Sequence, residues 1–272
     1  MATRSRWFQR RPVLLFVIVT FLVSYGLGFP ALFIAGSWAS GLSEVTQLYA
    51  GRFFVVIGPT CGAFAAVAAI SGRGAIASFL RRRLSLSAGW FAPAVLLPAI
   101  AIALVFFAYM LAGSPPEALA AILREAWPLL LIHVALQIFI VGLGEELGWR
   151  GWLLPSLTVR YGVSGATLFT GVIWYIWHLP ILLGGAADAF WFALAISGFS
   201  ILYSAMWVRS GQSAVLPAVA HGSVNAAVVF LTTVLPDAEH RVAWNILCGM
   251  VAACGLGVLL WTRAQWAQTS KV

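Results

Sequence analysis

The chain has 272 residues, of which 62% are hydrophobic and 9% are charged, and its formal net charge is +8. Ordinary soluble domains are about half apolar and about a quarter charged. A soluble fold of this size could not bury so much apolar surface, so the composition excludes an ordinary soluble domain and indicates that lipid is the solvent for much of the chain.

Long apolar segments follow one another along the chain, separated by short loops. Each is about 20 residues long, the length that crosses a bilayer as a helix, and none shows the two-residue alternation of a membrane β-barrel. We predict an all-α, polytopic membrane bundle of about eight transmembrane helices that forms a single domain, residues 1–272. In chain order, the predicted spans are Val13–Ala35, Phe53–Ile70, Trp90–Leu111, Trp127–Gly148, Ser164–Leu183, Asp188–Val208, Ala214–Val234 and Ala243–Trp261.

The basic residues predict the orientation of this bundle. With the N-terminus inside, an even number of spans also places the C-terminus inside, and 13 of the 16 basic residues then lie on the inner side, in agreement with the positive-inside rule. These are Arg4, Arg6, Arg10, Arg11, Arg73, Arg81, Arg82, Arg83, Arg150, Arg160, Arg209, Arg263 and Lys271. We therefore expect a multi-pass protein of the inner (cytoplasmic) membrane with both termini in the cytoplasm. Because no basic patch alternates with exposed aromatic residues, we expect no nucleic-acid partner.

Two adjacent acidic residues, Glu145 and Glu146, lie near the end of the fourth predicted span. An ionisable side chain at membrane depth costs about 2.5–3.5 kcal/mol on insertion scales, so stability alone does not explain the pair. Arg150 follows Glu146 by four residues, which predicts an ion pair on one helix face. Glu145 points about 100° away and can face a cavity as a general base. The alternative is that this segment merely ends a helix at the membrane interface.

Two histidines and an asparagine occupy later spans. His178 lies four residues after Trp174 in the fifth span, and Asn225 lies four residues after His221 in the seventh. The turn between the fourth and fifth spans centres near residues 161 and 162, so an antiparallel hairpin would bring Glu145 and His178 to similar depth. Taken singly, such residues more often pack or bridge helices. Together they form a constellation that we interpret as an active site.

Other polar and sulfur-containing residues are interpreted as structural. His133, with Gln137 one turn away, is predicted to be a packing residue, and His240 to lie solvated in an outer loop. The three cysteines lack metal-type spacing and are expected to be small core residues: Cys61, Cys248 and Cys254. The chain also lacks a His-Glu-x-x-His motif, a phosphate-binding glycine loop and a Gly-x-Ser-x-Gly motif.

At the residues of the constellation the chain resembles the CPBP family, the CAAX proteases and bacteriocin-processing enzymes, also called the Abi family. Glu145–Arg150 matches the family motif Glu-Glu-x-x-x-Arg, Trp174–His178 matches Phe-x-x-x-His with Trp in place of Phe, and His221–Asn225 matches His-x-x-x-Asn. The matching region, residues 145–225, is less than a third of the chain, but three motifs in this order are a specific signal.

The resemblance implies an intramembrane endopeptidase related to the type II CAAX prenyl endopeptidases. Glu145 would activate the attacking water with help from His178, and His221 and Asn225 would stabilise the tetrahedral oxyanion. Such donors and a base are what peptide hydrolysis needs. The supporting residues would be Glu146, Arg150 and Trp174.

A metal is left open by the sequence. Glu145, His178 and His221 could hold Zn²⁺ with one position open for water, whereas a metal-free glutamate mechanism uses the same residues. We favour the metal-free mechanism, because His221 and Asn225 suit the role of oxyanion donors.

The expected partners are the lipid bilayer and a membrane-associated peptide or protein substrate, such as a bacteriocin or signalling-peptide precursor. One Lys against 15 Arg suggests a GC-rich bacterial genome, and bacteria generally lack prenylated CAAX proteins, so CAAX cleavage is not expected. The oligomeric state is not predicted. Two alternatives to a protease are a proton- or cation-coupled transporter, in which the same ionisable residues form a relay, and a non-catalytic scaffold or immunity protein.

Overall fold

The computed structural model describes residues 11–31, 34, 41–182, 186–235 and 237–268. Within these residues every regular element is a helix, as the sequence predicts. The elements are α2 (Pro12–Phe21), η1 (Leu22–Gly28), α4 (Glu44–Val56), α5 (Gly58–Ser71), α6 (Ala75–Arg83), η2 (Ala88–Trp90), α7 (Phe91–Leu111), α8 (Pro116–Leu136), η3 (Gln137–Gly142), α9 (Leu143–Gly148), η4 (Trp149–Leu153), α10 (Leu154–His178), η5 (Leu179–Leu182), α11 (Ala186–Arg209), α12 (Val215–Val234) and α13 (Asp237–Gln268).

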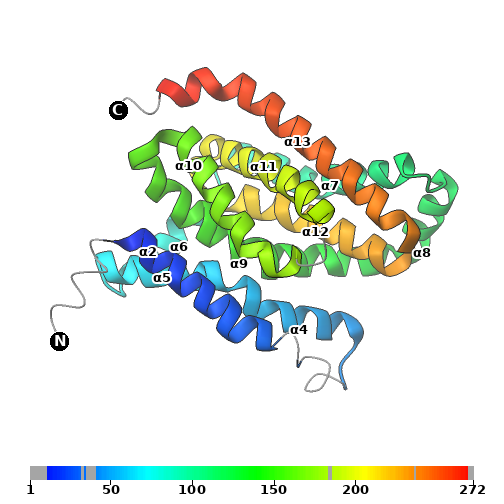
Figure 1. Ribbon diagram of the computed structural model, residues 1–272, viewed down its shortest axis with the longest axis horizontal. Helices are drawn as coiled ribbons and strands as arrows, with labels where there is room; N and C mark the ends of the chain where they lie inside the picture. Colours follow the sequence, from blue (N-terminus) through cyan, green and yellow to red (C-terminus); the bar gives the residue numbers. More distant parts are fainter. Residues whose placement is uncertain (1–10, 32–33, 35–40, 183–185, 236, 269–272) are drawn as a thin grey trace.

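The helices form layers around α12 (Figure 1). Helices α2, η1, α4 and α5 pack on one another as a layer on one side, and α9 lies against α5. Helix α12 packs against α7, α8 and η3, and α11 packs along α13 on the opposite side. Helix α12 is the most buried of the apolar helices, and its polar residues His221 and Ser223 are buried and thus removed from lipid.

Seven apolar helical segments of the described chain are long enough to cross a membrane. Six of them coincide with predicted spans, and the seventh, Pro116–His178, has 63 residues and contains both the fourth and fifth predicted spans. A straight helix of that length would measure about 95 Å, three times the apolar thickness of a bilayer. The polytopic membrane bundle is therefore confirmed. The described chain has seven apolar segments where eight spans were predicted, because this one segment contains two of the predicted spans.

The long segment reverses direction at Gly162, where φ is 63° and ψ is 177°. A side chain with a Cβ disfavours this conformation, so the glycine permits the reversal. The reversal is evident from Trp174, whose indole reaches the carboxylate of Glu145, 29 residues earlier; along a straight helix they would be about 44 Å apart. The predicted hairpin with its turn near residue 162 is thus present.

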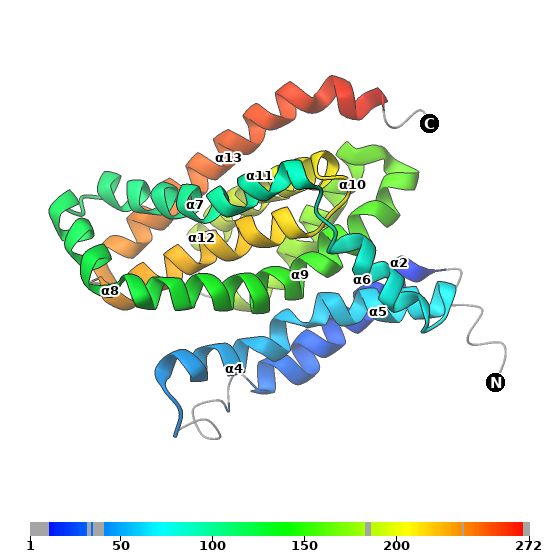
Figure 2. The same cartoon turned by 180° about the vertical axis from the view of Figure 1, so that it is seen from behind.

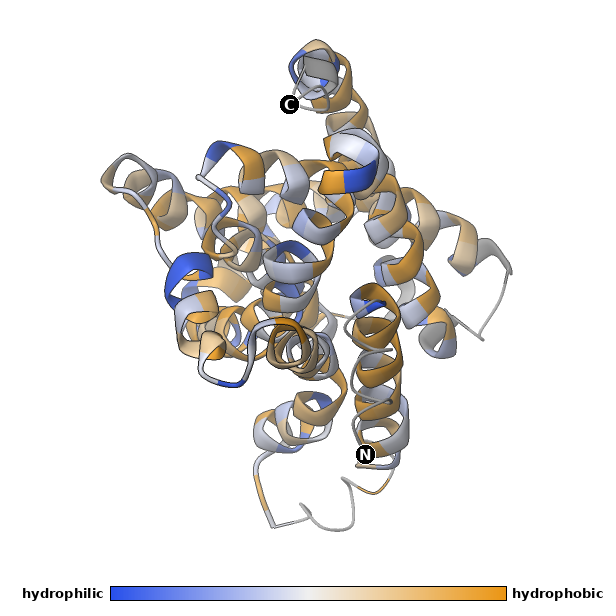
Figure 3. Ribbon diagram, turned by 90° about the vertical axis from the view of Figure 1, so that its left-hand side faces the viewer, coloured by the Kyte–Doolittle hydropathy of each residue, from blue (hydrophilic) through white to orange (hydrophobic). Residues whose placement is uncertain are grey.

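The start of α2 and the end of α13 lie at the same end of the bundle (Figures 1 and 2), as an even number of crossings requires. Hydrophobic residues run along most of each helix (Figure 3), which suits a surface in contact with lipid. Several residues used in the sequence predictions lie outside the described residues: Arg4, Arg6, Arg10, Ala35, Leu183 and Lys271. The inward orientation itself stays a prediction.

Two glycines allow the helices that surround the site to approach closely. A Cβ on Gly222 of α12 would lie 2.5 Å from the Cα of Ile138 in η3, and one on Gly148 of α9 would lie 2.4 Å from the carbonyl carbon of Pro59 in α5. Small residues let membrane helices pack backbone against backbone. The first contact brings α12 against η3, which directly precedes α9, and the second brings α9 against α5.

Candidate active site

The acidic pair lies in an unusual stretch of helix. Helix α9 has only 6 residues, and π-helical segments η3 and η4 precede and follow it. Single turns of π-helix are rare and frequently mark functional sites, because each wider turn changes the face on which the following side chains lie. The two carboxylates therefore emerge between two changes of helical register.

Glu146 is the fully buried member of the acidic pair. Arg150 Nη1 donates to Glu146 Oε1 at 2.9 Å, and both side chains are 0% exposed. His221 Nδ1 lies 3.0 Å from the same oxygen. Oε2 of Glu146 and Nε and Nη2 of Arg150 are fully buried without a partner among the described residues. The ion pair predicted from the four-residue spacing is confirmed, and the structure adds His221 to it.

Glu145 faces a different set of groups. Its Oε2 accepts hydrogen bonds from Trp174 Nε1 at 2.9 Å and from Trp149 Nε1 at 3.3 Å. Its Oε1 makes no hydrogen bond with a described residue and is absent from the fully buried, unpartnered atoms. One oxygen is thus held by two indoles, and the other has no hydrogen-bond partner among the described residues.

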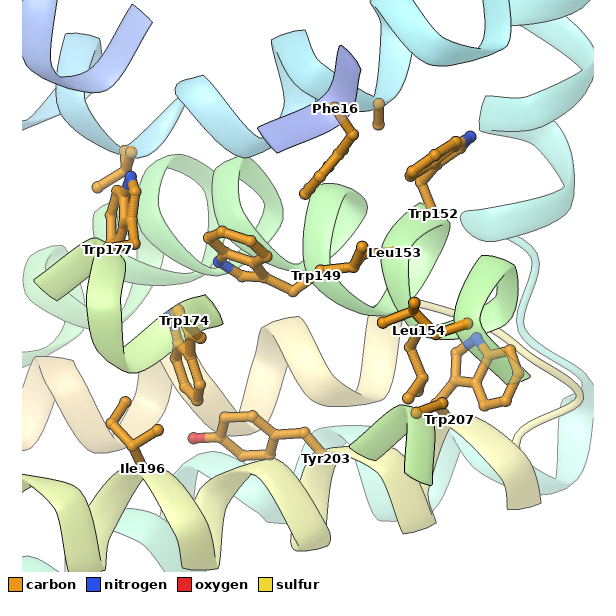
Figure 4. Packing of buried hydrophobic residues seen from close by; sticks show 14 of the residues in the cluster. Phe16, Trp149, Trp152, Leu153, Leu154, Trp174, Trp177, Ile196, Tyr203 and Trp207 are labelled. Atoms are coloured by element: carbon orange, nitrogen blue, oxygen red, sulfur yellow. The ribbon is translucent and has the colours of Figure 1, made fainter. Parts of the chain in front are cut away.

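Trp174 is the centre of the cluster. Its ring lies edge-on to His178 at 5.6 Å and to His221 at 5.4 Å between centroids, while its N–H holds Glu145. The guanidinium carbon of Arg150 lies 4.5 Å from the centre of the same ring, within cation–π range. Figure 4 shows the indole between Trp149 and Tyr203. The three motifs therefore meet around one side chain.

The hydrogen bonds select the tautomers of both histidines. His178 Nδ1 lies 2.9 Å from the carbonyl oxygen of Trp174, which can only accept, so Nδ1 carries a proton. His221 Nδ1 likewise faces the carboxylate of Glu146. Each Nε2 has no hydrogen-bond partner among the described residues and is absent from the fully buried set. A neutral ring then presents a lone pair at Nε2, and a protonated ring presents an N–H there.

Asn225 is half-buried on α12, one turn after His221. Its side chain makes no hydrogen bond with the described residues and is not among the fully buried, unpartnered groups. It is therefore an amide with free donor and acceptor capacity on the helix that carries His221.

The residues fit a metal site only in part. A zinc-bound histidine usually donates its other ring N–H to a carbonyl or carboxylate, as His178 and His221 do here. However, no group of three or more His, Cys, Asp and Glu side chains in the described chain is arranged to hold a metal ion. The set Glu145, His178 and His221 is thus not gathered as ligands in the described chain.

Sequence reasoning missed three contributions to the site. Tyr203 of α11 stacks on the His221 ring at 5.7 Å and lies 5.1 Å from the Arg150 guanidinium carbon. Trp149 binds Glu145, and its position four residues later could have indicated this contact. The π-helical turns and the contact of Tyr203 could not be predicted from the residues next to them in the sequence.

Residues interpreted as structural are placed partly as expected. His133 is buried and pairs with Tyr49 at 2.9 Å. Two expectations were wrong. His240 is half-buried, not freely solvated, and bonds to Tyr109 at 2.6 Å, because it lies at the start of α13 against α7. Cys248 is buried, but Cys61 is only partly buried and Cys254 is exposed, because its face of α13 points away from the bundle.

Together, the fold and the site define a polytopic membrane protein with a buried acid–histidine cluster. Residues 126–227 match the family described as type II CAAX prenyl endopeptidase Rce1-like, and this segment contains every candidate site residue. A protein named CAAX prenyl protease 2 from Methanococcus maripaludis is 27% identical over 105 residues, which are 35% of this chain and 39% of the relative. The chain thus aligns with less than half of the length of this curated relative. Both comparisons confirm the resemblance to the CPBP family of CAAX proteases.

Proposed function

We propose that the protein is an intramembrane endopeptidase that hydrolyses a peptide bond of a membrane-associated peptide or protein. The observation that carries the proposal is the contact of Trp174 with Glu145, His178 and His221, which gathers polar groups from three motifs at one point inside an apolar bundle. Such a gathering is costly in lipid unless function requires it. The family match over residues 126–227 supports the same activity.

In the proposed mechanism, Oε1 of Glu145 removes a proton from a water molecule, whose oxygen attacks the carbonyl carbon of the substrate. His178 orients this water through Nε2. The proton held by Glu145 then passes to the leaving amine as the carbon–nitrogen bond breaks. The indole N–H groups on Oε2 hold the carboxylate in place and leave its other oxygen to react.

His221 and Asn225 stabilise the oxyanion of the tetrahedral intermediate in this mechanism. His221 can donate from Nε2 only when both ring nitrogens are protonated, since its Nδ1 proton is held by Glu146. Charge balance favours that form, because two carboxylates and the Arg150 guanidinium leave one negative charge, which an imidazolium cancels. Glu146 and Arg150 thus act as positioning residues.

The test compares membrane peptides in strains that carry the wild-type protein, Glu145→Ala, His178→Ala or the control His240→Ala. His240 lies in contact with Tyr109, outside the site, and serves as a matched histidine control. We expect the same uncleaved precursors to accumulate with Glu145→Ala and His178→Ala but not with the control. Identical peptide profiles in all four strains would refute the proposal. Chelation followed by zinc addition, with metal content measured in parallel, tests the metal alternative.

A narrower candidate is a prenylated substrate with a CAAX terminus, which the description of the matching family and the name of the relative both favour. Proteoliposomes can be given matched synthetic peptides that end in a CAAX sequence, one farnesylated and one not. Cleavage of the farnesylated peptide alone would establish this substrate class. If neither peptide is cleaved although cellular precursors accumulate, the broader proposal stands and the prenyl substrate is excluded.

A further inference from the structure

A groove with a volume of about 470 Å³ lies apart from the acid–histidine cluster, between the end of α5, α6 and the start of α10. Figure 2 shows these elements together at one end of the bundle. One part of the lining is basic and hydroxylated and the other is apolar. The lining residues are Val67, Ile70, Ser71, Ala75, Ser78, Phe79, Arg82, Arg83, Gly151, Trp152, Pro155, Ser156 and Val159.

Two arginines of this groove converge on one neutral residue. Arg82 Nη2 lies 3.4 Å from Gln212 Oε1, and Arg83 Nη1 lies 3.3 Å from the same oxygen and 3.2 Å from the Gln212 carbonyl. Neither arginine pairs with a carboxylate of the described chain, and the sequence has no acidic residue between Glu44 and Glu117. Two like charges therefore share a single amide without a counter-ion.

Arg83 is also poorly satisfied within the protein. The residue is 9% exposed, and its Nε is buried without a hydrogen-bond partner among the described residues. Burial, together with the neighbouring charge of Arg82, lowers the pKa of Arg83 to about 10. A buried guanidinium that lacks a counter-ion and leaves its Nε without a hydrogen bond is unfavourable, and an anion at this position would relieve both the missing hydrogen bond and the repulsion.

The apolar part of the groove faces away from the protein. Ile70 is 51% exposed and Val159 is 91% exposed, and both lie beside Phe79 and Trp152. α6 itself is amphipathic and ends in three arginines. Exposed aliphatic side chains next to arginines that have no carboxylate partner, at the end of apolar spans, suit a ligand with an acyl chain and a charged phosphate.

We propose that this groove binds an anionic phospholipid, with Arg82 and Arg83 holding its phosphate and the apolar wall holding one acyl chain. Arginine is the side chain best matched to phosphate oxygens. A zwitterionic lipid fits less well, because its ammonium group would face the same two cations. This binding site is independent of the proposed protease activity.

The groove also contacts the elements that carry the candidate site. Gly151 and Trp152 directly follow the Glu146–Arg150 pair, and the Arg83 carbonyl accepts hydrogen bonds from Ser213 Oγ at 3.3 Å and from the Ala214 N–H at 2.8 Å, at the start of α12. A bound phosphate would thus brace α6 against the helix that carries His221.

The experiment measures lipid binding to purified, detergent-solubilised protein by native mass spectrometry, with phosphatidylglycerol, phosphatidylcholine or inorganic phosphate as the probe. The test variant is Arg82→Gln/Arg83→Gln, and the control is Arg73→Gln/Arg81→Gln, which removes the same charge from the same surface but not from the groove. We expect phosphatidylglycerol to bind the wild type at least tenfold more tightly than phosphatidylcholine. The test variant should lose this preference and the control should keep it.

Gln212→Glu gives a second test that does not remove an arginine. A carboxylate at this position would pair with both guanidinium groups, so we expect higher thermal stability and at least tenfold weaker binding of phosphatidylglycerol. The proposal is wrong if the test and control variants bind this lipid equally. Inorganic phosphate that binds as tightly as the lipid would also overturn it, because the site would then be one for free phosphate.

Discussion

The buried ion pair between Glu146 and Arg150 allows a quantitative test of how strongly these two side chains stabilise each other. Both side chains are 0% exposed, and Nη1 of Arg150 lies 2.9 Å from Oε1 of Glu146. Arg150→Met keeps an unbranched side chain of similar length but removes the charge and the contact with the Trp174 ring at 4.5 Å. The variant leaves Glu146 with His221 as its remaining partner.

Removing one member of a buried pair costs about 3–5 kcal/mol, because the other charge stays buried without its strongest partner. Loss of the cation–π contact adds up to about 2 kcal/mol. Glu146→Gln should cost about 3–5 kcal/mol for the same reason, since Arg150 is then unpaired. In the double variant neither member of this ion pair is left without the other, and the glutamine oxygen can still accept from His221 Nδ1. We therefore expect the double variant to be more stable than either single variant.

The assay is reversible unfolding in mixed detergent micelles, followed by the fluorescence of the 13 tryptophans. A coupling free energy of about 2 kcal/mol or more between the two positions is expected, within the range measured for residues of one buried network. Additive losses would contradict the reasoning, because they would mean that the two side chains do not sense each other. Even when its stability is restored, the double variant should be inactive, because His221 has lost the carboxylate that favours its protonated form.

Three further predictions concern one hydrogen bond, one close helix contact and the orientation in the membrane. Trp174→Phe introduces the residue of the family motif but removes the indole hydrogen bond to the carboxylate of Glu145, so the free energy of unfolding should fall by about 1.5–3 kcal/mol in the same assay. The helix content, measured by circular dichroism, should stay the same. Gly222→Ala places a Cβ 2.5 Å from backbone and should cost about 1–3 kcal/mol or abolish folding, whereas Gly257→Ala, with open space around it, should be neutral; equal yields in size-exclusion chromatography would contradict the close packing. In a cysteine-free background, cysteines at Ser85 and Glu117 should react with an impermeant thiol reagent from opposite sides of the membrane, Ser85 from the cytoplasmic side; labelling from one side would refute the predicted orientation.

The membrane bundle could be predicted because its cause is local in the sequence. Each span is recognisable in the sequence as a run of about 20 apolar residues. The residues between Glu145 and His178 must form a hairpin if these two side chains are to lie at the same depth in the membrane. The glycine at position 162 supplied the turn. Likewise, the pairing of Glu146 with Arg150 follows from a spacing of four residues on one helix.

Contacts between helices could not be predicted in the same way. Spacing within α12 places His221 and Asn225 on one face, but whether that face meets Glu145 or Glu146 depends on the register between α12 and α9. The close approach of Gly222 to Ile138 and the π-helical turns on either side of α9 set that register. None of these features has a distinctive residue pattern, because a π turn differs from an α turn by a single inserted residue.

Trp in place of Phe in the second motif does more than keep an aromatic ring at this position. A phenylalanine could border the histidines, but it has no donor for the carboxylate of Glu145. With Trp174 and Trp149 both bound to Oε2, the carboxylate cannot rotate without breaking two hydrogen bonds. The adjacent carboxylates thereby acquire separate tasks from their surroundings. Glu146 pairs with Arg150 and faces His221 Nδ1, whereas Glu145 accepts hydrogen bonds from two neutral indole groups. In the proposed mechanism the first carboxylate positions His221 and the second exchanges a proton with water. Trp174→Phe should therefore weaken the distinction, and a change in the pH profile of peptide cleavage, with folding intact, is the measurement that separates this role from simple packing.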